Sequence, residues 1–96
     1  YLLAVALVNA VGALARKEPA TWELAASGLR DTSRLAGSDL TMMGDILATN
    51  RAAVLAALGT AREELAALET ALRDAEPDDL LALLRAAHDR REEELR

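Results

Sequence analysis

The chain opens with a run from Tyr1 to Ala15 that is apolar on nearly every helical face and that only Asn9 interrupts. A membrane-spanning helix needs about 20 such residues, and this run stops at Arg16, which is too soon. The run also lacks the basic segment that precedes the apolar part of a signal peptide. We therefore predict a helix that is buried all round, in a bundle centre or a subunit interface, and that ends by Pro19.

Composition favours helix over strand throughout. The chain has 22 Ala and 19 Leu among 96 residues, against 4 Val, 1 Ile and no Phe. Ala and Leu are strong helix formers, whereas Val, Ile and Phe are typical of strands. We predict an all-α helical bundle of about four to five helices, two of them long. The absence of Cys excludes disulfides and thiol nucleophiles, and a single His makes a transition-metal site improbable, so we expect no metal.

Signals for helix ends divide the part that follows Pro19. A short helix is expected over Ala20–Ala26, with Trp22 as its large core anchor. Gly28 suggests a turn in which glycine adopts the left-handed conformation that caps a helix. The stretch Leu29–Ala36 is interpreted as a short turn or helix opening. Ser38–Asp39 then supplies the capping oxygens for the next helix.

From Leu40 to about Ala75 the sequence predicts one continuous helix that tolerates two glycines. Apolar residues within it advance by alternating steps of four and three, the spacing that packs on a near-antiparallel neighbour. This heptad seam consists of Val54, Leu58, Ala61, Leu65, Leu68, Leu72 and Ala75. Glu76–Asp79, which contains a proline, is expected to end this helix and start the last one, Leu80–Arg96. His88, the only imidazole, is expected to be a partly exposed residue of that last helix.

The charge is unevenly distributed. The formal net charge is −5, and residues 1–40 carry equal numbers of acidic and basic side chains. The acidic excess therefore lies in residues 41–96. An acidic surface disfavours binding to nucleic acid or to an anionic membrane. We expect neither as a partner.

One segment, Gly28 to Ala36, departs from the Ala- and Leu-rich background. Arg30 and Arg34 are four residues apart, so both would lie on one face if the segment is helical. Paired guanidinium groups beside hydroxyl groups suit a dicarboxylate or a phosphate. The alternative from spacing alone is that Asp31 or Thr32 caps a turn and the arginines form surface ion pairs.

Three motifs in order carry a resemblance to a known family. They are G-L-R-D-T-S-R-L-A-G-S-D from Gly28, M-M-G-D-I from Met42 and the Asn50–Arg51 pair. Together with the apolar opening they resemble the C-terminal dimerisation domain of prephenate dehydrogenases. Two positions depart from the usual family pattern: Met43 stands where Trp is common, and Tyr1 where His is common.

The resemblance implies an enzyme that oxidises and decarboxylates prephenate, or in some members arogenate, with NAD or NADP. By motif position, Arg34 would bind a substrate carboxylate and Arg30 would support the same anion. Asp31 would orient the two guanidinium groups, and Gly28 would let the backbone approach. In the family the dinucleotide-binding domain and the catalytic His precede this domain. We therefore expect residues 1–96 to be one helical domain of a longer protein, with no catalytic and no cofactor-binding residue.

The resemblance also implies a homodimer, and we expect a cytoplasmic one whose interface uses residues 1–15. A different class of function stays open beside the enzyme. A non-catalytic helical module could dock a partner through the same apolar helix, although such a module has no need of the Gly28–Ala36 segment. A dinucleotide-binding glycine loop encoded upstream would separate the two.

Overall fold

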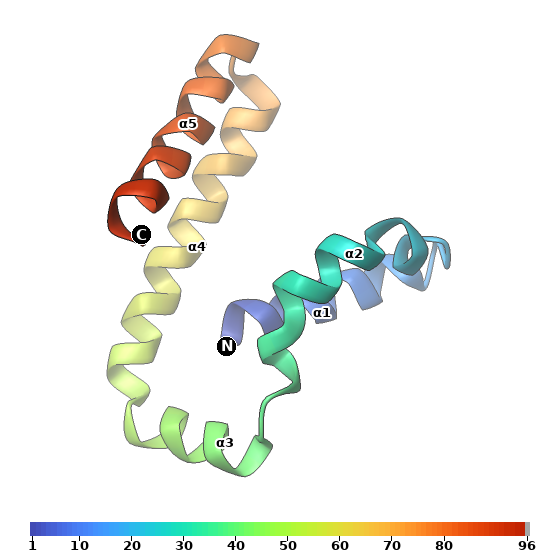
Figure 1. The fold of residues 1–96 in the computed structure, drawn as a ribbon, viewed down its shortest axis with the longest axis vertical. Helices are drawn as coiled ribbons and strands as arrows, with labels where there is room; N and C mark the ends of the chain where they lie inside the picture. Colours follow the sequence, from blue (N-terminus) through green and yellow to red (C-terminus); the bar gives the residue numbers. More distant parts are fainter. Residues whose placement is uncertain (96) are drawn as a thin grey trace. The chain divides into compact units, whose positions relative to one another are not determined.

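The computed structural model describes residues 1–95, and it describes their side chains except those of residues 24–27. Residues 1–95 form helices joined by short turns, with no strand among them, which confirms the all-α prediction. The elements are α1 (Leu2–Ala15), α2 (Thr21–Ser33), the 3-10 helix η1 (Arg34–Gly37), α3 (Leu40–Thr49), α4 (Arg51–Asp74) and α5 (Pro77–Glu94) (Figure 1). The chain divides into two compact units, the first from Tyr1 to Thr49 and the second from Asn50 onward.

In the first unit, α1 packs against α2 and η1 along one face only. The buried positions of α1 are Ala4, Val11 and Ala15, which recur at helical spacing and are small enough for close approach. On other sides Leu3 and Leu14 keep 65% and 60% of their surface exposed. The first unit covers only one stripe of α1, so the burial on all sides that the sequence predicts for a bundle centre or a subunit interface is not reached within this unit.

Trp22 joins the two helices without being enclosed. Its ring atom Cζ2 lies 3.9 Å from where a Cβ on Gly12 would stand, an ordinary van der Waals separation, so the indole packs against α1 at this position. Trp22 nevertheless keeps 44% of its surface exposed. It packs on α1 as an anchor at the edge of the α1–α2 contact, and the prediction that it lies in a core is only partly right.

The predicted turn at Gly28 is wrong. Helix α2 runs unbroken from Thr21 to Ser33, and no glycine of the described chain has a positive φ. The Thr32 hydroxyl donates a hydrogen bond to the Gly28 carbonyl at 2.7 Å, as in a helix interior. An interior glycine costs a helix only about 1 kcal/mol relative to alanine. That cost is too small to break a helix whose other face packs on α1.

The helix start predicted at Ser38–Asp39 is confirmed. The backbone leaves the helical region at Ser38, where ψ is 163°, after η1 has ended at Gly37. The Met42 amide donates a hydrogen bond to the Asp39 carboxylate at 2.8 Å, which satisfies an amide that the first turn of α3 leaves unpaired.

The continuous helix predicted from Leu40 to Ala75 is divided in two. Helix α3 ends at Thr49 and α4 begins at Arg51, with Asn50 between them at φ −122° and ψ 24°. Asparagine is a weak helix former because its side chain competes for backbone hydrogen bonds. The two glycines that looked like the weak points, Gly44 and Gly59, are both inside helices.

The second unit is a hairpin in which α5 runs back along α4 (Figure 1). Pro77 occupies the first turn of α5 together with Asp78 and Asp79, as predicted for this helix start. Glu69 and Arg73, four residues apart on α4, form an ion pair at 3.5 Å on the exposed side.

The hairpin gives the heptad seam only part of the cover that its spacing predicts. Helix α5 is the antiparallel neighbour, yet Leu65 and Leu72 of the seam keep 67% and 75% of their surface exposed. None of the described side chains of α4 and α5 is buried. One helix covers a single stripe of its neighbour, so the other side of the seam has no packing partner within this unit.

The unbroken α2 predicts that Gly28→Ala stabilises the protein. An added Cβ meets nothing within 4 Å, and the backbone has no positive φ that would strain it. The free energy of unfolding should rise by about 0.5–1 kcal/mol, measured by denaturant titration. Gly59→Ala, also in open space within a helix, is the matched control and should behave alike. If Gly28→Ala lost stability and Gly59→Ala did not, Gly28 would adopt the left-handed turn conformation that the sequence predicts.

Candidate functional site

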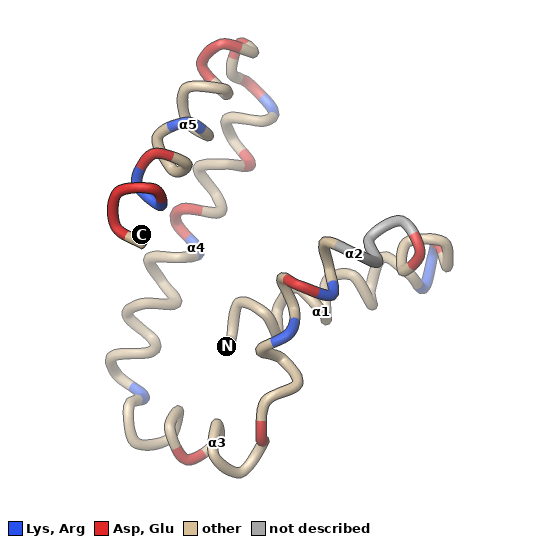
Figure 2. The backbone as a smooth tube through the Cα atoms, viewed as in Figure 1, with Lys and Arg blue, Asp and Glu red and all other residues tan. Residues whose placement is uncertain are grey.

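The candidate site is the junction of α2 and η1, which carries the unusual segment from Gly28 to Ala36. Arg30 lies in the last turn of α2, and Arg34 begins η1 with helical backbone angles, φ −49° and ψ −41°. The backbone is thus helical through both positions, and their spacing of four places them on one face. Figure 2 shows basic, acidic and basic positions following one another at this end of α2. The local geometry needed for a paired cationic site is therefore present.

The charged side chains of this junction are exposed and unpaired. Arg30, Asp31 and Arg34 are all exposed, and among the described side chains none of them forms an ion pair or a hydrogen bond. The surface ion pairs offered as the alternative reading are therefore not formed. The ion pair by which Asp31 would orient the arginines is not formed either, so that role stays a prediction.

The neutral residues of the junction are used differently. The Thr32 hydroxyl donates its hydrogen bond to the Gly28 carbonyl inside the helix, so it does not cap a turn. Open space surrounds Gly28, since a Cβ added there would meet no atom within 4 Å. The backbone at Gly28 is accessible to an approaching molecule, but nothing in the first unit encloses it.

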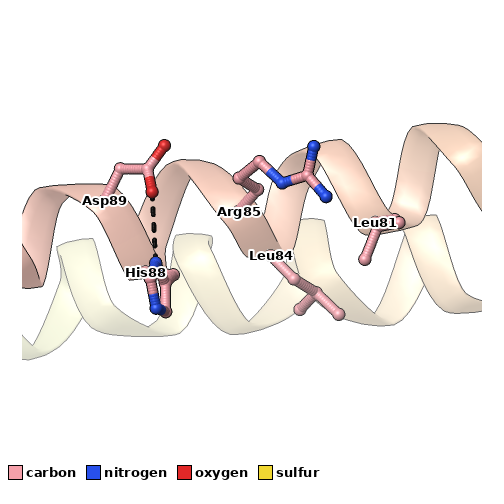
Figure 3. A pocket seen from close by; sticks show the side chains of 5 residues that line it. All are labelled: Leu81, Leu84, Arg85, His88 and Asp89. Carbon is pink, nitrogen blue, oxygen red and sulfur yellow. Dashed lines mark hydrogen bonds and ion pairs between the residues drawn. The ribbon is translucent and has the colours of Figure 1, made fainter.

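His88 lies away from these residues in sequence, on α5. Its Nδ1 is 3.1 Å from an oxygen of the neighbouring Asp89 carboxylate, and both side chains are mostly exposed. Figure 3 shows the two residues at an open hollow on α5 with Leu81, Leu84 and Arg85. All five lining residues are exposed. The prediction of an exposed helical histidine is confirmed, and no third group completes a catalytic arrangement among these lining residues.

The described residues include no cluster of three or more His, Cys, Asp or Glu side chains that could hold a metal ion. No helix among them combines the length and the apolar character needed to cross a membrane.

The remaining feature of the first unit is an uncovered apolar stripe on α1. Leu3, Leu7, Ala10 and Leu14 are spaced by four, three and four residues, which aligns them along one side of the helix. Three of them are exposed and Leu7 is half-buried. We call these four residues the α1 stripe. Apolar surface of this regularity is typical of helices that pack against another protein surface.

Taken together, the fold is a small helical domain whose apolar helix faces are only partly covered within one chain. Residues 1–86 match the family described as "Prephenate dehydrogenase, dimerization domain". The match spans α1 to α4 and the first part of α5, so the chain belongs to this family. This confirms the resemblance seen in the sequence motifs. No curated protein and no solved structure matches the chain.

Membership of a dimerisation-domain family gives the apolar surfaces a meaning: the domain self-associates. The sequence predicted an interface from residues 1–15, and the α1 stripe contains Leu3 and Leu14, the exposed large apolar side chains of that segment. It did not predict that Leu65 and Leu72 of the heptad seam would be left uncovered. The seven-residue spacing was the available signal, but it was assigned wholly to the neighbouring helix.

The exposure of the arginines leads to a prediction about stability. Arg30→Ala and Arg34→Ala should each change the free energy of unfolding by less than about 0.5 kcal/mol, because neither side chain has a packing or ionic partner to lose. The matched comparison is Val11→Ala, which removes a buried side chain and should cost about 1.5 kcal/mol or more. Urea unfolding followed by circular dichroism provides the measurement. If either arginine variant costs as much as Val11→Ala, that arginine has a structural role.

Proposed function

We propose that this chain is the helical dimerisation and substrate-binding part of a cytoplasmic enzyme. The enzyme would oxidise and decarboxylate prephenate, or the related arogenate, with NAD or NADP. Family membership supports the reaction, since the matched family is named for prephenate dehydrogenase. The single observation that supports substrate binding is the pair of exposed guanidinium groups of Arg30 and Arg34 on one helical face, which have no ion-pair partner among the described side chains.

The residues of this chain do not fit a dinucleotide cofactor. Its five glycines, at positions 12, 28, 37, 44 and 59, form no G-x-G-x-x-G loop that could cradle a pyrophosphate. Residues 1–95 also contain no strand from which such a loop could emerge. We therefore propose that NAD or NADP binds another domain, and that no residue of this chain contacts the nicotinamide.

The chemistry of the substrate suits the arginine pair. Prephenate is a dianion, and an arginine can hold a carboxylate through two parallel N–H···O bonds. Because the guanidinium groups have no partner in the described part of the chain, they need not break an ion pair to bind an anion. Arg34 would make the bidentate contact and Arg30 would add positive charge beside it. The bound carboxylate would fix the substrate ring in one orientation for the reaction.

Dimerisation would complete the site. The junction of α2 and η1 is open to solvent on the first unit alone, and an anion bound to an open surface is strongly screened by water. A second protein surface, from the partner chain or from the cofactor domain, would exclude that water. We propose that the α1 stripe contributes to the interface that brings this surface into place.

The kinetic test uses Arg34→Ala in the full-length enzyme. We expect KM for prephenate to rise about 10- to 150-fold, the worth of a charge-assisted bidentate contact of roughly 1.5–3 kcal/mol. Arg34→Lys should recover only part of the affinity, because an ammonium keeps the charge but loses the planar fork. KM for the nicotinamide cofactor should not change.

The matched control is Arg16→Ala, an exposed arginine of the same unit outside the junction, which should leave KM for prephenate unchanged. A KM within twofold of the wild type in Arg34→Ala would remove Arg34 from the site. If the protein were instead a non-catalytic helical module, neither the wild type nor any of these variants would bind prephenate.

The dimerisation role is tested separately with Leu14→Asp. Leu14 is 60% exposed in one chain, so a charge there should not disturb folding. If the α1 stripe lies in the interface, burying an unpaired carboxylate should raise the dimer dissociation constant by at least about tenfold. Sedimentation equilibrium of the wild type and the variant gives the two constants. Ala13→Asp, at an exposed position beside the stripe, is the control, and equal constants for Leu14→Asp and the wild type would exclude the stripe from the interface.

A further inference from the structure

The hairpin of α4 and α5 carries more uncovered apolar surface than its own contacts explain. None of its described side chains is buried, although nine of its leucines are large, apolar and exposed. They are Leu55, Leu58, Leu65, Leu68 and Leu72 on α4, Leu81, Leu83 and Leu84 on α5, and Leu95, which directly follows α5. Two helices of this length gain little stability from propensity alone and rely on packing of an apolar face. The exposed leucines of the hairpin therefore indicate that another protein surface packs against them.

The exposed leucines are ordered along α4. Leu58, Leu65 and Leu72 are each seven residues apart, so they form a nearly straight line with a step of about 10.5 Å. Their exposed fractions are 39%, 67% and 75%. We call these three residues the α4 stripe. Because the spacing is equal on both sides of Leu65, an antiparallel copy of the stripe would bring leucine against leucine at all three positions.

Helix α5 adds a hollow that leucines line on one side. Figure 3 shows Leu84 and His88 on one side of α5 and Arg85 and Asp89 on the other. Leu81, Leu84 and His88 follow one another at helical spacing. An apolar floor with charged groups at its edge is the composition of an interface rather than of a solvated helix face.

We propose that the α4 stripe packs antiparallel on the α4 stripe of a second copy of this chain, with Leu65 at the two-fold axis. The two hairpins would then form a four-helix bundle. The inference deepens the dimerisation part of the proposed function and is independent of the arginine site. A second copy is the indicated occupant because the family is a dimerisation domain and its match continues through all of α4 into α5, to residue 86.

The charges decide between the two ways of stacking the hairpins. Acidic residues gather at the turn between α4 and α5, as Figure 2 shows: Asp74, Glu76, Asp78 and Asp79. If both turns lay at the same end of the bundle, eight carboxylates would face one another at short range, which is destabilising. The antiparallel arrangement places the two turns at opposite ends. It also brings Leu58 of each chain against the partner's Leu72.

The absence of cysteine from the sequence makes a direct test possible in the otherwise unmodified chain. Single cysteines are introduced at the two-fold axis (Leu65→Cys), at the ends of the stripe (Leu58→Cys and Leu72→Cys), and on the opposite side of α4 (Glu63→Cys). Each variant is oxidised by copper-phenanthroline and air, and disulfide-linked dimer is followed on a non-reducing gel. A disulfide requires Cα atoms within about 7 Å, so it reports facing positions.

The proposal expects Leu65→Cys to cross-link at least about tenfold faster than Glu63→Cys, because the interface raises the local concentration of the facing thiols. Neither Leu58→Cys nor Leu72→Cys should cross-link efficiently alone, whereas an equimolar mixture of the two should give the mixed dimer. Circular dichroism of each variant confirms that it is folded.

Two outcomes would overturn the proposal. Efficient self-linking of Leu72→Cys would show that the turns lie at the same end. Cross-linking of Leu65→Cys no faster than of Glu63→Cys would show that something other than a second α4 stripe covers Leu65, such as the first unit or another domain. The Leu14→Asp and Arg34→Ala measurements do not depend on these cysteines. A negative cross-linking result therefore leaves the proposed function unaffected, and negative results for Leu14→Asp or Arg34→Ala leave the α4 pairing unaffected.

Discussion

The apolar surface that one chain leaves uncovered is the constraint on which the rest of this domain depends. Among the described side chains, only Ala4, Val11 and Ala15 form a buried core, and all three come from one face of α1. Small side chains allow close helix packing but bury little area, so they contribute little to the hydrophobic stabilisation of a domain this size. Membership of a dimerisation-domain family gives the physical resolution: the remaining faces are covered when chains associate.

The candidate site follows from how the chain leaves α2. A helix that stays intact through Gly28 and passes directly into η1 keeps Arg30 and Arg34 in register on one face. The turn predicted at Gly28 would have lain before both arginines, so their alignment depends on the helical backbone between Arg30 and Arg34 rather than on Gly28. The same helix holds Thr32 in an internal hydrogen bond, which leaves the guanidinium groups as the free polar groups with which this junction can bind an anion.

Several local features were predictable because each depends on a few neighbouring residues. The cap at Asp39 and the start of α5 at Pro77 follow from side chains that satisfy or replace backbone amides. The positions at which helices are interrupted were predicted less well. Gly28 and Asn50 both weaken a helix by about 1 kcal/mol or less, which is too small a preference to fix a helix end by itself. The helix continued through Gly28, in the α2 that packs on α1, and broke at Asn50.

The sequence by itself determined the helical class, the family and the position of the arginine pair, because composition, motif order and spacing are properties of the chain alone. Only the tertiary structure decided which stripe of each helix is covered. The spacing of Leu58, Leu65 and Leu72 predicts that they lie along one line, but a line of leucines packs equally well on any apolar surface. Hydrophobic burial has no direction of its own. The geometry of the hairpin, which leaves Leu65 and Leu72 exposed beside α5, therefore had to be observed.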